Sequence, residues 1–290
     1  MATDDHIRNP VEWGWHQLKG AGHAVGSAAH AVEGDGAARR GAHPAIRRIG
    51  AADLRIALEK GFEDFGACRT DVIFLCLIYP VVGLVLAQMV FGSDMLHLVF
   101  PLASGFALLG PVAAMGLYEM SRRREAGATV NWADAFGVLR SPAFAAMVAL
   151  GVLLVAIFLL WLAAAWGIYA VTLGPEAPAS IGAFAAAVFT TGAGWAMIGL
   201  GIGVGFLFAA AVLTISVVSF PLLLDRDVGV AEAISTSVRA VRANPRTMAL
   251  WGLIVAGGLV LGSIPALLGL AIVMPVLGHA TWHLYRRVVE

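Results

Sequence analysis

The sequence predicts an all-α membrane protein with six transmembrane helices, arranged as three hairpins, each preceded by an amphipathic cytoplasmic interfacial helix. Long apolar runs fill the chain from residue 71 onward, only 13% of the residues are charged, and all 19 Lys and Arg lie outside the apolar runs. A soluble domain carries about 25% charged residues. So few charges could hardly cover a soluble surface, and we expect much of the surface to face lipid.

The apolar runs define the predicted crossings. A helix needs about 20 apolar residues to cross a hydrocarbon core of about 30 Å. The run 181–224 exceeds one crossing, so we place the crossing at 195–224 and leave 181–194 as a short extra helix or an extension outside the membrane. In the last run Pro265 disfavours continuous helix, which predicts two short crossings joined by a tight turn. The six predicted crossings are 71–91, 96–120, 143–171, 195–224, 247–262 and 266–285.

The positive charges predict the orientation. With six crossings and a cytoplasmic N-terminus, every Lys and Arg lies in the tail or in a cytoplasmic loop, and the three outer loops hold none. Five crossings would place Arg286 and Arg287 outside. The acidic N-terminus is followed by no apolar core, so it does not predict a secretory signal peptide. We expect a multi-pass protein of the bacterial inner (plasma) membrane with both termini in the cytoplasm.

The chain divides into a tail and a membrane domain. Residues 1–45 are rich in Ala, Gly and His and predict a flexible cytoplasmic tail, whereas 46–290 form the six-span domain. Segments 132–136 and 230–234 share a pattern of bulky residue, Ala, acid, Ala and bulky residue before the third and fifth crossings. A looser match precedes the first crossing, with apolar residues along one helix face: Leu54, Leu58, Phe62 and Phe65. We expect these helices to lie in the headgroup plane.

A resemblance rests on Asn244-Pro245, Met248, Trp251-Gly252 and the run 275–286. These residues resemble a family of uncharacterised bacterial predicted integral membrane proteins, some of which are labelled cytochrome c oxidase. The resemblance covers about 46–289 and implies a six-span fold without an established activity. A haem–copper catalytic subunit needs several membrane histidines as ligands. Only three histidines lie in or near the predicted crossings, namely His97, His279 and His283. The chain is therefore not that subunit, although an accessory or assembly role stays open.

His279 and His283 are the one candidate metal site. They lie four residues apart, on one helix face near the end of the last crossing. Two histidines at this spacing can ligate a metal ion or lie beside a haem. The alternative is a pair of interfacial residues in an aromatic and basic anchor. We predict no bound cofactor, and we expect Cys68 and Cys76 to be unpaired structural thiols.

Basic side chains near the crossings are candidates for contact with lipid headgroups or a protein partner. They are Arg122, Arg123, Arg124, Arg239, Arg242, Arg286 and Arg287. In the fourth crossing Gly199/Gly203 and Gly201/Gly205 form small-x-x-x-small pairs, which favour close helix packing over the alternative of a path or hinge for a substrate.

Ionisable residues inside a membrane mark transport pathways. The third to sixth crossings contain no Asp, Glu, Lys or Arg, which argues against an ion-coupled transporter. No nucleophile–base–acid set is visible, so we predict a non-enzymatic accessory, scaffold or assembly component that contacts membrane lipids and other membrane subunits. The alternatives are a transporter or channel for a neutral or lipidic solute and a haem- or metal-binding component of a respiratory chain. A zero net charge gives no reason to expect a nucleic-acid partner.

Overall fold

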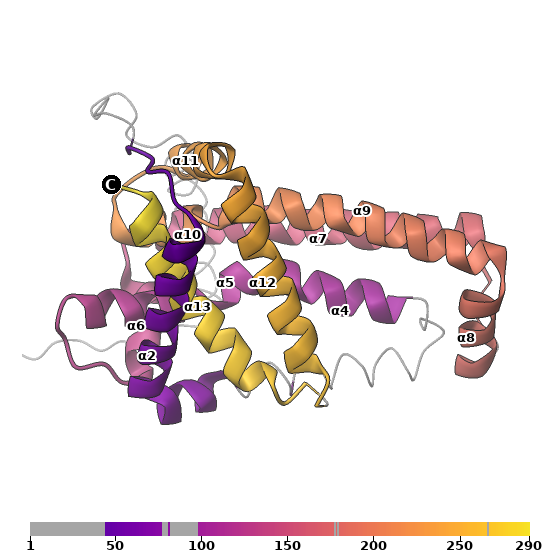
Figure 1. Cartoon of the computed structure of the whole chain (residues 1–290), viewed down its shortest axis with the longest axis horizontal. Helices are drawn as coiled ribbons and strands as arrows, with labels where there is room; N and C mark the ends of the chain where they lie inside the picture. Colours follow the sequence, from indigo (N-terminus) through magenta and orange to yellow (C-terminus); the bar gives the residue numbers. More distant parts are fainter. Residues whose placement is uncertain (1–43, 77–80, 82–97, 177, 179, 266) are drawn as a thin grey trace, which may run out of the picture.

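The computed structural model describes residues 44–76, 81, 98–176, 178, 180–265 and 267–290, and this part of the chain is helical (Figure 1). The predicted tail and most of the predicted first crossing lie outside these residues. The helices are α2 (Ala51–Cys76), α4 (Val99–Leu108), α5 (Gly110–Ala113), α6 (Met115–Glu125), the 3₁₀ helix η2 (Trp132–Arg140), α7 (Phe144–Thr172), α8 (Ile181–Thr190), α9 (Gly192–Ser216), α10 (Ser219–Asp225), α11 (Val230–Ala243), α12 (Pro245–Ser263) and α13 (Leu270–Val288).

Within the described ranges, three helical stretches are long and apolar enough to cross a membrane. They are Phe144–Thr172, Gly192–Asp225 and Pro245–Ser263, and they coincide with the predicted crossings 143–171, 195–224 and 247–262. The helices α7 and α9 run side by side along the length of the molecule (Figure 1). Large aliphatic side chains stand exposed along both, including Val152 and Leu207, as expected of a surface in lipid. The count of six crossings and their grouping into hairpins stay predictions.

The segment 181–194 is a separate structural unit. The ten-residue helix α8 precedes α9 and is too short to cross a membrane. Side-chain caps separate the two helices: the Ser180 hydroxyl accepts from the Ala183 N–H at 3.1 Å, and the Thr191 hydroxyl accepts from the Gly194 N–H at 2.9 Å. The alternative of a short extra helix is therefore confirmed for 181–190, while α9 begins at Gly192.

The predicted second crossing is a broken helix. From Val99 onward it consists of α4, α5 and α6, with interruptions at Leu109 and Ala114. Pro111 explains the first break, because proline has no backbone N–H and its ring collides with the carbonyl group four residues earlier. The segment extends to Glu125, five residues beyond the predicted end at Met120.

The amphipathic helices pack against protein. In α2 the apolar face contacts α13, which buries Leu54 and Ala57 while Phe62 alone of the predicted apolar set is exposed. In α11 the buried face carries small residues, including Ala233, Ser237 and Ala240. Periodicity predicts a face but not what covers it: the apolar face of α2 is covered by α13, and the position of these helices in the headgroup plane stays a prediction. The repeat is also uneven, because η2 is a 3₁₀ helix and α11 an α-helix.

The two ends of the described chain meet beside α11 and α12. Ile46 and Val289 form an isolated antiparallel bridge, and the Arg47 N–H donates to the Val288 carbonyl at 2.8 Å. Asn244 holds this segment: its side-chain oxygen accepts from the Ile49 N–H at 2.7 Å, and its amide nitrogen donates to the Arg47 carbonyl at 3.1 Å. The last turns of α6 and α13 lie at this same end of the molecule, and α8 lies at the opposite end (Figure 1). We call these the basic end and the far end.

The closest approach of α2 to α13 is at Gly61. A β-carbon added there would stand 2.7 Å from the Ala280 β-carbon and 2.8 Å from both the Ala280 nitrogen and the Val276 oxygen. Two of these atoms belong to backbone, which cannot rotate away. Only glycine allows the two helices to approach this closely.

We therefore expect Gly61→Ala to destabilise the protein by about 1–3 kcal/mol, the usual cost of overpacking. Gly66 is the matched control in the same helix, because an added β-carbon would meet no atom within 4 Å there. Gly66→Ala should be neutral or stabilising, because alanine favours helix. Thermal unfolding in detergent measures both variants. Equal melting temperatures for the two would show that the Gly61 contact is not required.

Candidate functional site: a buried carboxylate–imidazole network

Four polar side chains meet where α2, α6 and α13 pack together. Asp64 comes from α2, Ser121 from α6, and His279 and His283 from successive turns of α13. All four are buried, with exposed fractions of 1% for Ser121 and His279, 7% for Asp64 and 8% for His283. Buried polar groups are costly unless they are hydrogen-bonded, so their mutual contacts decide whether this packing is stable.

Asp64 is the centre of the network. Its Oδ2 atom accepts a hydrogen bond from Ser121 Oγ at 2.6 Å and lies 2.8 Å from His283 Nε2. Its Oδ1 atom accepts from Arg124 Nη1 at 2.9 Å, and the same Nη1 donates to the Glu63 carbonyl at 2.8 Å. One carboxylate thus joins three helices.

These partners determine the charge state of Asp64. Burial by itself would raise the pKa of its carboxyl, but the hydrogen bonds to His283 and Ser121 and the electrostatic contribution of the neighbouring imidazoles outweigh burial, so the pKa lies below its ordinary value of 3.8. Asp64 is ionised at neutral pH and serves as an acceptor only.

His279 completes the network with one ring nitrogen. Its Nδ1 atom lies 2.7 Å from Ser121 Oγ, whereas no side-chain hydrogen bond to its buried Nε2 atom is formed within the described part of the chain. Ser121 has one hydroxyl proton, and the stronger bond is to the charged carboxylate. The ring therefore donates Nδ1–H to Ser121.

The arrangement differs from a catalytic triad. In a triad the imidazole lies between the nucleophile and the carboxylate. Here Ser121 lies between Asp64 and His279, and the Nδ1 atom of His279 is 4.0 Å from the carboxylate. With Ser121 and His279 both buried, the geometry favours a cross-link between helices over nucleophilic chemistry.

Metal binding by His279 and His283 stays a prediction. The two histidines are buried in the network, and their place at the membrane interface stays a prediction as well. Among the described residues, no group of three or more His, Cys, Asp and Glu is arranged to hold a metal ion. His97 lies outside the described residues, as do the histidines of the tail.

Most of the predicted lipid- or partner-contacting arginines form ion pairs within the chain. Arg122 and Arg123 both bind the buried Glu119, the former at 2.8 Å and the latter at 2.6 Å. The other pairs are Arg123 with Asp134, Arg124 with Asp64, Arg239 with Glu232, Arg286 with Glu125 and Asp225, and Arg287 with Asp53. The paired side chains remain about one third exposed, and Arg242 is fully on the surface. Contact with headgroups or a partner stays a prediction for these seven.

Asp64 and Ser121 were not among the residues predicted from the sequence. A signal for Asp64 was present: it lies ten positions after Leu54, with Ala57 and Gly61 between them at helical spacing on the same face. A carboxylate on the apolar face of a helix requires a buried partner. Nothing in the local sequence identifies that partner, which lies 219 positions away at His283.

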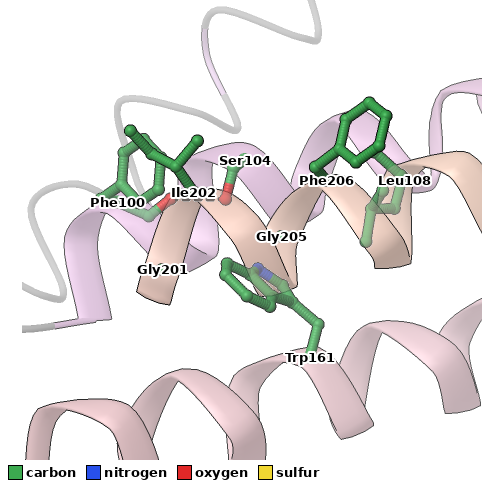
Figure 2. A pocket seen from close by; sticks show the side chains of 9 residues that line it. Phe100, Ser104, Leu108, Trp161, Gly201, Ile202, Gly205 and Phe206 are labelled. Carbon is green, nitrogen blue, oxygen red and sulfur yellow. Dashed lines mark hydrogen bonds between the residues drawn. The ribbon is translucent and has the colours of Figure 1, made fainter. Parts of the chain in front are cut away.

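An apolar pocket is the second candidate site. It has a volume of about 260 Å³ and lies between α4, α7 and α9 (Figure 2). The Trp161 ring projects from α7 between the other two helices, and its Nε1 donates to the Pro101 carbonyl at 2.9 Å. Gly205 makes room for this ring, because an added β-carbon would stand 3.1 Å from the indole. Ser104 is the one hydroxyl in the lining, and it bonds the Phe100 carbonyl.

The apolar helices and the ion-paired basic end define the class as an integral membrane protein. Residues 99–225 match the profile of the family described as "Predicted integral membrane protein (DUF2189)", a family of unknown function. The predicted resemblance is thereby confirmed over α4 to α10. The match includes Ser121 but not Asp64, His279 or His283, and it excludes the segments at 244–252 and 275–286 that first suggested the resemblance. No curated protein and no solved structure gives a significant match.

If Asp64 holds the three helices together, Asp64→Asn should destabilise the protein by about 1.5–3 kcal/mol, the usual contribution of hydrogen bonds to a charged group. The control in the same helix is Glu59→Gln, which removes an exposed pair with Arg55 and should cost less than about 1 kcal/mol. Denaturant unfolding in detergent at pH 7 compares the two variants.

The pH dependence provides a second check on the same variant. Because the pKa of Asp64 is lowered in the folded protein, its stabilisation is complete above the ordinary value of 3.8 and is lost as the pH falls through the folded value. The difference between wild type and Asp64→Asn should therefore be constant from pH 7 to about pH 5 and shrink below about pH 4. A difference that grows on acidification would contradict the assignment of an ionised Asp64.

Proposed function

We propose that this integral membrane protein is a non-enzymatic accessory, scaffold or assembly component of a membrane complex that acts by helix packing. The observation that carries the proposal is an exposed row of small residues along α9. Gly199 and Gly203 lie on its surface, and a β-carbon added at either would meet no atom of the described residues within 4 Å. Ala196 and Gly192 extend the row toward the far end.

Small residues spaced by four allow the backbone of a second helix to approach closely. In α9 the opposite face is already used: Gly205 packs on Trp161 of α7, and Gly194 packs on the backbone of α8. The predicted close packing at Gly199 and Gly203 therefore finds no partner in the described part of the chain, which favours a helix of another subunit. The closed Asp64 network supports the same proposal, because it presents no exposed reactive group.

Replacing both glycines, Gly199→Leu with Gly203→Leu, should abolish association with a partner while leaving the chain folded. The matched control is Leu200→Phe, which enlarges an exposed side chain on another face of the same helix turn. Purification in mild detergent followed by native electrophoresis compares the two variants with wild type. Recovery of the chain alone from wild-type membranes, or equal recovery of partners with all variants, would overturn the proposal.

The second candidate is a passage for a neutral or lipidic solute, and the apolar pocket beside Gly201 and Gly205 favours it. It predicts protein-dependent movement of a fluorescent phospholipid across the bilayer of proteoliposomes. Gly205→Leu should slow this movement, because the new side chain would fill the pocket beside Trp161, whereas Gly199→Leu should not. Movement equal to that in protein-free liposomes would remove this candidate.

A haem- or metal-binding component of a respiratory chain is the third candidate, and it rests on His279 and His283. The hydrogen bonds to Ser121 and Asp64 already occupy Nδ1 of His279 and Nε2 of His283, which weighs against it. The absorbance spectrum of the purified protein distinguishes a haem protein from the other two candidates.

A further inference from the structure

In the hairpin formed by α12 and α13, most of α13 packs along α2, and only a short apolar part of α13 extends beyond this contact. From Val276 to Val288, α13 packs along α2, and three contacts fix the register of the two helices. Arg287 pairs with Asp53 at 2.9 Å, Gly61 meets Val276 and Ala280, and His283 bonds Asp64. The second half of α13 therefore lies at the same level as residues 53–64 of α2.

This part of α2 is highly charged. Its residues 53–64 carry six ionisable side chains: Asp53, Arg55, Glu59, Lys60, Glu63 and Asp64. The side chains of Arg55 and Glu59 are 81% and 53% exposed. A helix with exposed charges of both signs lies in water or among headgroups, because each charge costs several kcal/mol in hydrocarbon. The second half of α13 is consequently outside the hydrocarbon core as well.

Little of α13 remains to enter the membrane. From Val276 back to the start of the helix at Leu270 there are six residues, which at 1.5 Å each extend about 9 Å. A complete crossing requires about 30 Å. The first arm ends at the same depth, because a β-carbon added to Gly269 would stand 2.7 Å from the Gly262 carbonyl oxygen of α12.

The tip of the hairpin is apolar and exposed. Between Arg246 and Arg286 the chain carries no Asp, Glu, Lys or Arg. Large apolar side chains stand exposed at the tip, among them Leu261, Ile264 and Leu268, at 68%, 73% and 62%. The one hydroxyl of the turn, that of Ser263, bonds the Leu259 carbonyl at 2.7 Å. A tip of this composition is suited to hydrocarbon.

The connection that follows the long helix α7 has the opposite character. The connection from α7 to α8 contains Gly174, Pro175 and the exposed Glu176, as expected of a loop in water. In Figure 1 this connection is at the far end of the molecule, whereas the turn between α12 and α13 lies well short of that end. The two turns therefore lie at different positions along the long axis of the molecule.

We infer that α12 and α13 form a re-entrant hairpin, which enters the membrane from the basic end, buries its tip among the acyl chains of one leaflet, and returns without crossing. The partner of the exposed tip is lipid hydrocarbon. Arg246 and Arg286 lie on the same side of the membrane in this topology, as they would with two complete crossings, so the positive-inside pattern is preserved.

Single-cysteine labelling of the full chain in native membranes tests this inference. With Cys68→Ala and Cys76→Ala as background, Leu268→Cys reports on the tip, Glu176→Cys on the far end and Arg242→Cys on the basic end. A membrane-impermeant maleimide is applied to right-side-out cells and to inverted vesicles. Since the reagent requires a thiolate, which does not form in hydrocarbon, Leu268→Cys should react about tenfold or more slowly than either control from both sides.

After solubilisation in denaturing detergent the tip cysteine should react fully, which shows that the thiol is intact. Reaction from the same side as Glu176→Cys would demonstrate a complete crossing and overturn the inference. Reaction from the same side as Arg242→Cys would place the tip in water and overturn it as well. Ser263→Cys, which exchanges one oxygen for sulfur, provides the same readout if Leu268→Cys does not insert.

Discussion

The packing of α2 against α13 depends on one buried carboxylate. Asp64 lies on the face of α2 that contacts α13, where a charge without partners would separate the helices. His283, Ser121 and Arg124 supply donors from two other helices, so Asp64 is tolerated only when α2, α6 and α13 are assembled together. The contact at Gly61 has the same requirement, since two backbones can approach this closely only in one register.

Around Asp64, further carboxylates at the basic end also connect helices by pairing with arginines. Glu119 joins two arginines of its own helix, and Asp225 and Glu125 receive Arg286 from the last helix. The structure thus has two parts with different chemistry. Long apolar helices face lipid, and a polar layer at one end connects them through side-chain bonds. Such a division favours a structural role, because the polar groups bind one another.

Part of this architecture follows from the sequence alone. Hydropathy predicts α7, the stretch formed by α9 and α10, and α12 with ends within a few residues, because about 20 apolar residues without a charge have one favourable environment. The break after Ser263 follows from the proline nearby. The histidines four apart were also identified as a pair, because spacing on one helix determines a shared face.

The sequence does not reveal whether the apolar face of an amphipathic helix packs against lipid or against protein. The apolar stripe of α2 fits a membrane surface and a protein surface equally well, and only the tertiary structure shows that α13 covers it. For the same reason the arginines were expected to contact lipid headgroups or a partner, although three of the seven bind carboxylates from distant segments: Arg124, Arg286 and Arg287. Hydropathy also predicts a crossing at α13, although the second half of this helix lies beside the charged residues of α2.

The pairing of α2 with α13 has a consequence for the synthesis of the protein. Asp64 and His283 are 219 positions apart. At a translation rate of roughly 5–20 residues per second, α2 leaves the ribosome about 10–45 seconds before its partner exists. During that interval the face of α2 is uncovered, and Asp64 lacks the donors that α13 provides. The basic end can therefore close only after α13 has been synthesised, so a chain truncated before α13 would expose a surface suited to recognition by membrane quality control.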